Sequence, residues 1–163
     1  MTIQLTTQRI YTRSGGLRTT FSDFVCVHCH NFVSAQAALA GVHHRNHCPY
    51  CLSSRHLDLY TAGDRLAACK ARMNPIGLTL KRQHKKYARY AQGELMLIHL
   101  CEDCERIAIN RIAADDDDDA IEAIFHASLQ LNGHIRRLLV ENGITLLGVA
   151  EQTLVQRCLF GRN

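Results

Sequence analysis

The sequence predicts an α+β fold, with short antiparallel strands in its first two thirds and helices at its C-terminal end. Three patterns support this prediction. Cysteines recur as Cys-x-x-Cys pairs at 26–29, 48–51 and 101–104. Residues 76–80 and 94–100 have the pattern of β-strands, and apolar residues recur at helical spacing after residue 120. With 163 residues, of which 47% are hydrophobic and 21% charged, the chain has the composition of a packed globular protein.

The first half of the chain is predicted to alternate between short strands and turns. Residues 1–20 are polar and basic and form an arm or an edge strand. A strand, a cysteine turn and a second strand follow over 24–33, and the small residues of 34–42 form a turn or short helix. A weak alternation predicts a strand at 56–60. A short helix is expected over 66–73, ended by Asn74-Pro75.

The second half is predicted to form a long hairpin and then helices. Strands at 76–80 and 94–100 flank a basic tip, and 105–112 adds a third strand. The aspartates of 115–119 precede a helix that starts near Ala120 and ends at Asn132-Gly133, and two further helices follow. The predicted domains are therefore an N-terminal arm (1–20), a central domain (21–131) and a C-terminal helical segment (132–163).

Four cysteines have the spacing of a structural zinc site. Cys26-x-x-Cys29 and Cys48-x-x-Cys51 are separated by 18 residues, within the range of about 15–20 that is typical of paired zinc knuckles. Two such turns that face each other complete a closed tetrahedron of thiolates. The sequence therefore predicts zinc-ribbon-like knuckles on the short strands. Iron held by four thiolates, or disulfides in a secreted domain, are the alternatives.

A second zinc site is predicted from the third cysteine pair. His99 lies two residues before Cys101, so both side chains would face the same way on a strand. Cys69, His99, Cys101 and Cys104 would then supply three thiolates and one imidazole. His84 and His126 are competing fourth ligands, and unliganded thiols with a buried Cys69 are the alternative without a metal.

Positive charge gathers in the first part of the chain. Residues 1–93 hold thirteen Lys or Arg and three acids, whereas residues 94–163 hold six Arg and twelve acids. The segment 81–90 has five basic residues, no acid and two tyrosines. Cations neutralise phosphates and tyrosines stack on bases, so this segment favours nucleic-acid binding. The predicted contacts are Arg45, Lys81, Arg82, Lys85, Lys86, Tyr87, Arg89 and Tyr90.

The string His44-Arg45-Asn46-His47-Cys48-Pro49-Tyr50-Cys51 resembles the signature of the RNHCP domain family. Further matching segments follow the family's order over about residues 21–130: Phe24–Cys29, Gly63–Arg65, Cys69, Met73–Ile76, His99–Cys104 and Asn110–Asp116. The resemblance implies a small, mostly bacterial, zinc-binding protein and supports Cys69 and His99 as members of a site. It also implies roles for His44, Arg45, Asn46, His47, Asn110, Arg111, Asp115 and Asp116.

The favoured function is a structural zinc protein that binds nucleic acid, with RNA preferred and the ribosome as a candidate partner. One alternative is a metal-dependent hydrolase or nuclease that uses His44, His47, Asp115 and Asp116. The two aspartates are also explained as caps of the following helix. A protein-interaction adaptor is the third possibility, and an enzyme is the less favoured class. The cysteine usage, with no secretory signal and no apolar run long enough for a membrane span, predicts a cytoplasmic protein.

Overall fold

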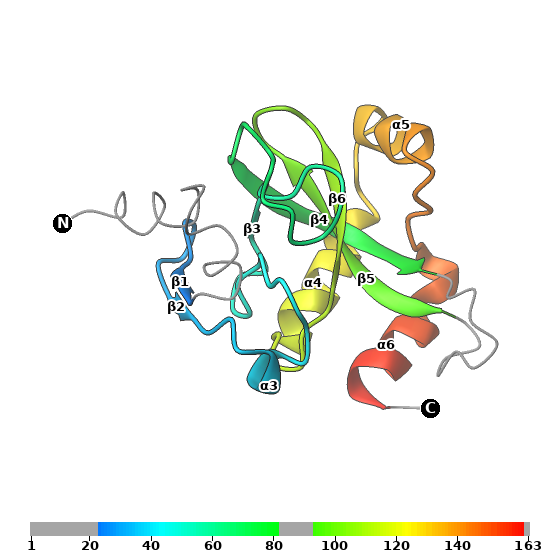
Figure 1. Cartoon of the computed structure of the whole chain (residues 1–163). Helices are drawn as coiled ribbons and strands as arrows, with labels where there is room; N and C mark the ends of the chain where they lie inside the picture. The colour runs from blue at the N-terminus through cyan, green and yellow to red at the C-terminus, as the bar shows by residue number, and fades with distance from the viewer. Residues whose placement is uncertain (1–22, 82–92, 162–163) are drawn as a thin grey trace. The chain divides into compact units, whose positions relative to one another are not determined.

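The computed structural model of the chain describes residues 23–81 and 93–161. Its elements are β1 (Phe24–Val25), β2 (Phe32–Val33), α3 (Ala37–Ala40), β3 (Ser54–Arg55), β4 (Arg72–Lys81), β5 (Glu94–Cys101), β6 (Ile107–Arg111), α4 (Asp118–Ser128), α5 (Gly133–Glu141), the 3-10 turn η1 (Val149–Glu151) and α6 (Gln152–Phe160) (Figure 1). Antiparallel strands followed by helices confirm the predicted α+β class.

The chain divides into two compact units. The knuckle unit comprises Met1–Asn74, Cys101–Glu105 and Ala113–Asp117, and the sheet–helix unit comprises Pro75–Leu100, Arg106–Ile112 and Asp118–Asn163. Strands β1 and β2 pair as a two-stranded ribbon, seen in blue in Figure 1. The other strands form a sheet in the order β3-β4-β5-β6.

The core of the knuckle unit is small and consists partly of sulfur. Cys26, Val33 and Cys48 form a buried cluster, against which Phe24 and two further cysteines pack. A second cluster joins Ala40 and Val42 with Ala113. Leu52, Leu57 and Met73 are further buried apolar side chains of this unit, and bound metal is a usual additional source of stability in small domains.

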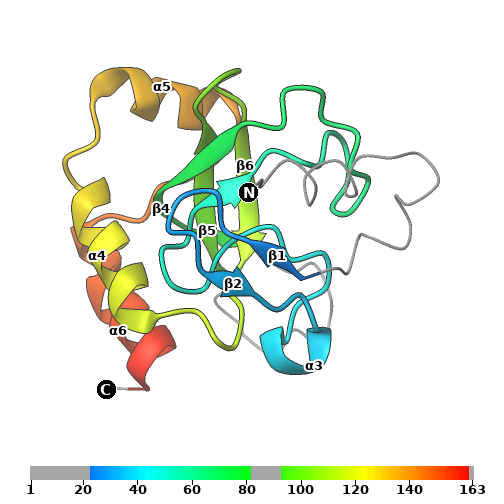
Figure 2. The ribbon, with the colours of Figure 1, turned by 90° about the vertical axis from the view of Figure 1, so that its left-hand side faces the viewer.

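The sheet–helix unit has a conventional apolar core. Figure 2 shows α4, α5 and α6 on one side of the strands of this unit. Ile98, Ile107 and Leu139 are buried between sheet and helices. Strand β4 comes close to the segment after α5: a Cβ on Gly77 would lie 2.5 Å from Leu146 Cδ1. The Leu147 N–H also donates to the Leu78 carbonyl at 2.9 Å, so this segment lies along β4.

Two element predictions were wrong. The helix expected over 66–73 is not formed, and Arg72 and Met73 instead begin β4, where they pair with β3. The strand expected at 56–60 lies earlier, at Ser54–Arg55. The predicted arm, residues 1–20, lies outside the described residues.

Candidate metal centres

The first metal centre brings together the four cysteines that the spacing predicted. The Sγ atoms of Cys26, Cys29, Cys48 and Cys51 all lie within 4.8 Å of one another. Cys26 and Cys51 are 3.5 Å apart, as are Cys29 and Cys48, so the two turns face each other. Four convergent sulfurs fit a tetrahedral zinc ion with no open coordination position.

The three cysteine turns share one backbone geometry. The residue four positions after the first cysteine has a positive φ in each case: 61° at His30, 58° at Leu52 and 55° at Glu105. In the first two turns the N–H of this residue donates to the carbonyl of the first cysteine. A left-handed residue at this place turns the chain back on itself, so that both thiols of a pair point to the same side.

The thiols of the first centre differ in their acidity. The backbone and side-chain N–H groups of Asn31 outweigh the effect of burial and lower the pKa of Cys29 to about 6. Burial raises the pKa of Cys48 and of Cys51. Four thiolates in one place are stable only when a metal offsets desolvation and mutual repulsion, and zinc does this without redox chemistry.

The second metal centre contains His56 and not His99. The donor atoms of His56, Cys69, Cys101 and Cys104 lie within 4.8 Å of one another. His56 Nδ1 is 2.8 Å from the Sγ of Cys69 and 3.2 Å from that of Cys104. The Sγ of Cys69 is 3.7 Å from that of Cys101. Three thiolates and one imidazole again fit zinc, so the protein has two zinc sites.

The prediction of His99 as the fourth ligand is corrected for a geometric reason. The imidazole of His99 is not among the donor atoms that converge at the second centre. His99 is fully buried, and its Nδ1 lies 2.9 Å from the Asn110 amide nitrogen. His56 instead follows β3, where its N–H donates to the Ala71 carbonyl close to Cys69. The sequence gives little indication of this role, because His56 is a single histidine that follows the short strand after the second knuckle.

Of the two competing histidines, the structure places one, His126, and it is not among the donors of the second centre. His126 lies in α4, with Nε2 3.9 Å from a carboxylate oxygen of Glu122. His84 lies outside the described residues.

Arg72 connects the first and third cysteine turns. Its Nη1 lies 2.6 Å from Nδ1 of His28, in the first turn. Its Nε donates to Glu102 Oε1 at 2.9 Å, in the third turn, and its carbonyl accepts from the Glu102 N–H at 3.0 Å. Arg72 and Asn74 lower the pKa of Glu102, and Glu102 raises that of Arg72. One arginine thus braces turns from both metal centres.

The Arg-Asn-His string belongs to a buried polar network. Arg45 Nη1 lies 2.8 Å from Asp115 Oδ2, and Nη2 lies 3.0 Å from Asp116 Oδ1. His47 Nε2 is 2.7 Å from Asp116 Oδ2, which also accepts from the Ala113 N–H. The Arg45 side chain is fully buried. The prediction that Arg45 contacts nucleic acid is therefore wrong, because its guanidinium is withdrawn from solvent.

The same network corrects two interpretations of the aspartates. Asp115 and Asp116 do not cap α4, because they pair with Arg45, and the acids in the first turn of α4 are Asp118 and Asp119. Both oxygens of Asp116 are also engaged by Arg45, His47 and a backbone N–H. A buried carboxylate occupied in this way is not available to a hard cation, so the geometry does not favour the hydrolase site.

The other residues that the family signature singled out are also engaged within the fold. The Asn46 amide donates to Asp58 at 2.9 Å and accepts from Arg65. His44 packs against Gly63, where a Cβ would lie 2.5 Å from its Nδ1. In the sheet–helix unit, Asn110 pairs with His99, and Arg111 forms an ion pair with Glu94 at 2.7 Å.

The basic segment begins where β4 ends. Lys81 is the last residue of β4 and is exposed. The other predicted contacts, Arg82, Lys85, Lys86, Tyr87, Arg89 and Tyr90, lie outside the described residues.

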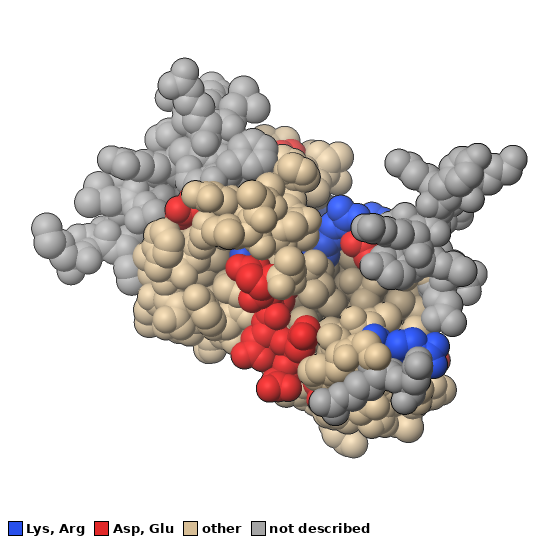
Figure 3. Space-filling view, turned by 90° about the horizontal axis from the view of Figure 1, so that it is seen from below, with Lys and Arg blue, Asp and Glu red and all other residues tan. Residues whose placement is uncertain are grey.

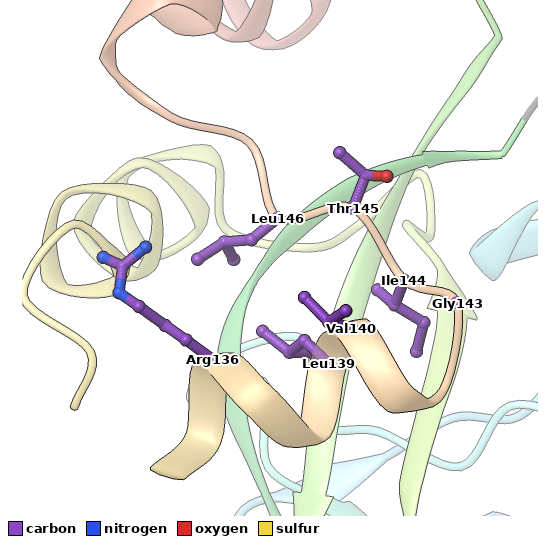
Figure 4. Close-up of a pocket in the computed structure, with 7 residues that line it drawn as sticks. All are labelled: Arg136, Leu139, Val140, Gly143, Ile144, Thr145 and Leu146. Carbon is purple, nitrogen blue, oxygen red and sulfur yellow. The ribbon is translucent and has the colours of Figure 1, made fainter. Parts of the chain in front are cut away.

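A pocket of about 350 Å³ lies along α5 in the sheet–helix unit (Figure 4). Leu139, Val140, Ile144 and Leu146 make its lining mainly apolar. Its charged side chain, Arg136, extends toward the end of α4 and donates to carbonyls there, including that of Leu129 at 2.9 Å. The pocket therefore shows no cluster of acids, bases or metal ligands.

Comparisons with known proteins place the chain in a family. In the described part of the chain, none of the helices is long and apolar enough to cross a membrane. Neither the curated proteins nor the solved structures include a match to the chain. The family model of the RNHCP domain matches residues 21–122, which is more than half of the chain and includes both metal centres. The chain therefore belongs to the RNHCP domain family.

Proposed function

We propose that this zinc protein binds nucleic acid, with RNA favoured and the ribosome as a candidate partner, through the basic segment 81–90. The observation that carries the proposal is the pair of strands that flanks this segment in the sequence. It joins β4 to β5, which are neighbours in the sheet. Leu78 and Leu97 are fully buried in these strands and Leu95 is nearly so. Between these two packed strands the sequence supplies cations and tyrosines, which suit contact with a phosphate backbone and its bases.

The charge distribution supports the same segment. Residues 23–81 and 93–161 contain eleven Lys or Arg against fifteen Asp or Glu. Seven thiolates shared by two divalent ions add a further negative charge of about three. Acidic side chains are prominent on the face in Figure 3. The chain's excess of positive charge thus lies in residues 1–22 and 82–92, which together contain seven Lys or Arg and no acid. Residues 82–92 hold four of these cations in half the length of residues 1–22, so a polyanion should be attracted most strongly there.

The test is RNA binding measured by fluorescence anisotropy at several salt concentrations. The slope of log Kobs against log salt should become less negative by about 3 when four cations are neutralised. Each phosphate contact of a single strand contributes about 0.7 to this slope. The variant replaces Arg82, Lys85, Lys86 and Arg89 with Gln. Tyr87→Ala with Tyr90→Ala should weaken binding and leave the salt slope unchanged, because stacking involves no counterion release.

The matched control neutralises Arg9, Arg13 and Arg18 instead. If this control loses as much affinity as the variant of the basic segment, the binding site is assigned to the wrong segment. Absence of binding at 50 mM salt would refute the proposal altogether. Sedimentation with ribosomes, compared between the native chain and the variant, tests the partner separately.

A further inference from the structure

The two metal centres differ in how far their sulfurs reach the surface. In all three turns the first cysteine is buried, with exposed fractions of 2% at Cys26, 0% at Cys48 and 1% at Cys101. The second cysteine is half-buried at Cys29 and Cys51 but exposed at Cys104.

This difference leaves one sulfur pair with an exposed member, whereas Cys29 and Cys51 of the first centre are both half-buried. In the first centre each of the 3.5 Å pairs joins a buried sulfur to a half-buried one. In the second centre, Cys69 and Cys104 are 3.6 Å apart, and they are half-buried and exposed respectively. A reagent can therefore attack Cys104 while a second accessible sulfur lies beside it.

We propose that Cys69 and Cys104 form an oxidation site, at which hydrogen peroxide makes a disulfide and releases the second zinc ion while the first centre keeps its metal. Oxidation of zinc-bound thiolates follows exposure, so it should begin at Cys104. The proposal concerns the metal centre and does not depend on nucleic-acid binding.

The reaction balances in two steps. The Cys104 sulfur attacks one peroxide oxygen, so that an S–O bond forms, the O–O bond breaks and hydroxide leaves to become water. The Cys69 thiolate then attacks the sulfenic sulfur, forming the S–S bond and expelling a second hydroxide. Two thiolates, one peroxide and two protons give one disulfide and two waters, and the sulfurs supply both electrons.

Loss of the two thiolates removes half of the ligand set. The ion would keep only Cys101 and His56, too few donors for a closed zinc site, so it dissociates. The sulfurs have to approach from 3.6 Å to about 2.05 Å, and Cys104 is the exposed member of the pair.

The charge around Cys104 favours a neutral oxidant over an anionic one. Glu102 on the same turn is paired with Arg72, while Asp103, Glu105 and Arg106 are exposed, so the turn keeps a small net negative charge. This charge repels an anion such as glutathione disulfide, whereas hydrogen peroxide is neutral and approaches without this penalty. Peroxide should therefore release zinc faster than glutathione disulfide at equal concentration.

The experiment uses the full-length chain loaded with two zinc ions. Cys158 is exposed in α6, so Cys158→Ser is included to remove a competing thiol. A chromophoric chelator follows zinc release after peroxide addition, and peptide mass mapping locates the disulfide. We expect one zinc ion per chain in a fast phase, together with a Cys69–Cys104 disulfide.

Two substitutions provide matched controls. Cys104→His keeps four zinc donors but removes one sulfur, and should slow the fast phase about tenfold or more. Cys51→His makes the same change in the first centre, and its first disulfide should still join Cys69 and Cys104. Release of both ions at one rate, or a first disulfide among Cys26, Cys29, Cys48 and Cys51, would overturn the proposal. Mass mapping on the Cys158→Ser chain, which keeps all eight zinc ligands, identifies the first disulfide. This result does not depend on whether Cys104→His retains its second zinc ion.

Discussion

Arg45 and Asp116 form an ion pair in which both side chains are fully buried, with 3.0 Å between Nη2 and Oδ1. The two residues are 71 positions apart, so the pair fixes the Arg-Asn-His string to the segment that precedes α4. A buried charge is tolerated only when it is paired and hydrogen-bonded. At Asp116, His47 and the Ala113 N–H supply the remaining hydrogen bonds. The string that defines the family therefore organises the knuckle unit as well as contributing Cys48 to the metal.

Removal of the Asp116 carboxylate should strongly destabilise the protein. Asp116→Ala leaves Arg45 buried with only the partly exposed Asp115 as a counterion and deprives His47 of its partner. Breaking a buried pair in this way costs about 3–5 kcal/mol of unfolding free energy. Urea unfolding of the zinc-loaded protein measures the loss.

Arg111→Gln provides the control for this prediction. It breaks an ion pair with Glu94 whose arginine side chain is 55% exposed, and pairs of this kind contribute less than about 1 kcal/mol. Equal losses for Asp116→Ala and Arg111→Gln would contradict the structural role of the network.

The sequence could not predict this network, although it identified its members. Arginine is a common phosphate ligand, so Arg45 was assigned to a binding surface, and the aspartates to the cap of the helix that follows them. Both assignments relied on local chemistry. The actual partner of each group lies about 70 positions away, and only the folded chain brings them together.

The fourth ligand of the second zinc site can be tested by stoichiometry. His56→Ala should reduce tightly bound zinc from two ions to one per chain, because three donors leave an open site. His99→Ala should retain two ions and instead lower stability by about 1–3 kcal/mol, since it leaves the Asn110 amide without its partner. Zinc analysis after dialysis, combined with urea unfolding, separates the two effects.

Cobalt substitution gives an independent measurement for the same pair of variants. Visible absorption of the cobalt protein reports both ligand type and tetrahedral geometry. The spectrum should change for His56→Ala and remain that of the native protein for His99→Ala. The opposite result would restore His99 as the ligand.

Metal ligands were predictable from the sequence where they come in pairs, and less so where they come singly. The Cys-x-x-Cys spacing predicted both halves of the first centre and one half of the second. Cys69 was found because few cysteines remained to be assigned. His56 was missed because β3 is only two residues long and the chain after it lacks a regular pattern. The three C-terminal helices were predicted from their apolar spacing, but not all of their bounds: α4 ends at Ser128 rather than at Asn132-Gly133, and α6 begins at Gln152.

Asp64 holds the turn at residues 59–66, and its loss should loosen that turn. Its carboxylate accepts four backbone N–H bonds, from Leu59, Tyr60, Thr61 and Leu66. Burial opposes ionisation, but these donors prevail and hold the pKa of Asp64 far below its usual range. Asp64→Ala should cost about 1 kcal/mol, as does the loss of a helix N-cap. Hydrogen exchange of the four amides should become faster while the rest of the unit is unchanged.

The pH dependence of this interaction follows from the direction of the shift. A lowered pKa means that the unfolded chain binds the proton first, so the contribution of Asp64 is complete above its unfolded value of about 4 and is lost as the pH falls through the folded value. The difference in stability between the native chain and Asp64→Ala should therefore be constant from pH 5 to pH 8. A difference that declines across this range would show that another group is responsible.

Gly63 should not tolerate a side chain, for two separate reasons. Its φ of +88° disfavours any residue with a Cβ, and a Cβ there would lie 2.5 Å from His44 Nδ1. Gly143 offers a matched comparison, because it has a φ of +68° but no atom within 4 Å of the added Cβ. Gly143→Ala should cost about 1 kcal/mol from backbone strain alone. Gly63→Ala should cost about 1–3 kcal/mol more, because His44 has to move against a packed neighbourhood. If Gly63→Ala and Gly143→Ala lose equal unfolding free energy in urea, the His44 side chain can move aside without cost. Its contact with Gly63 would then not position the family string.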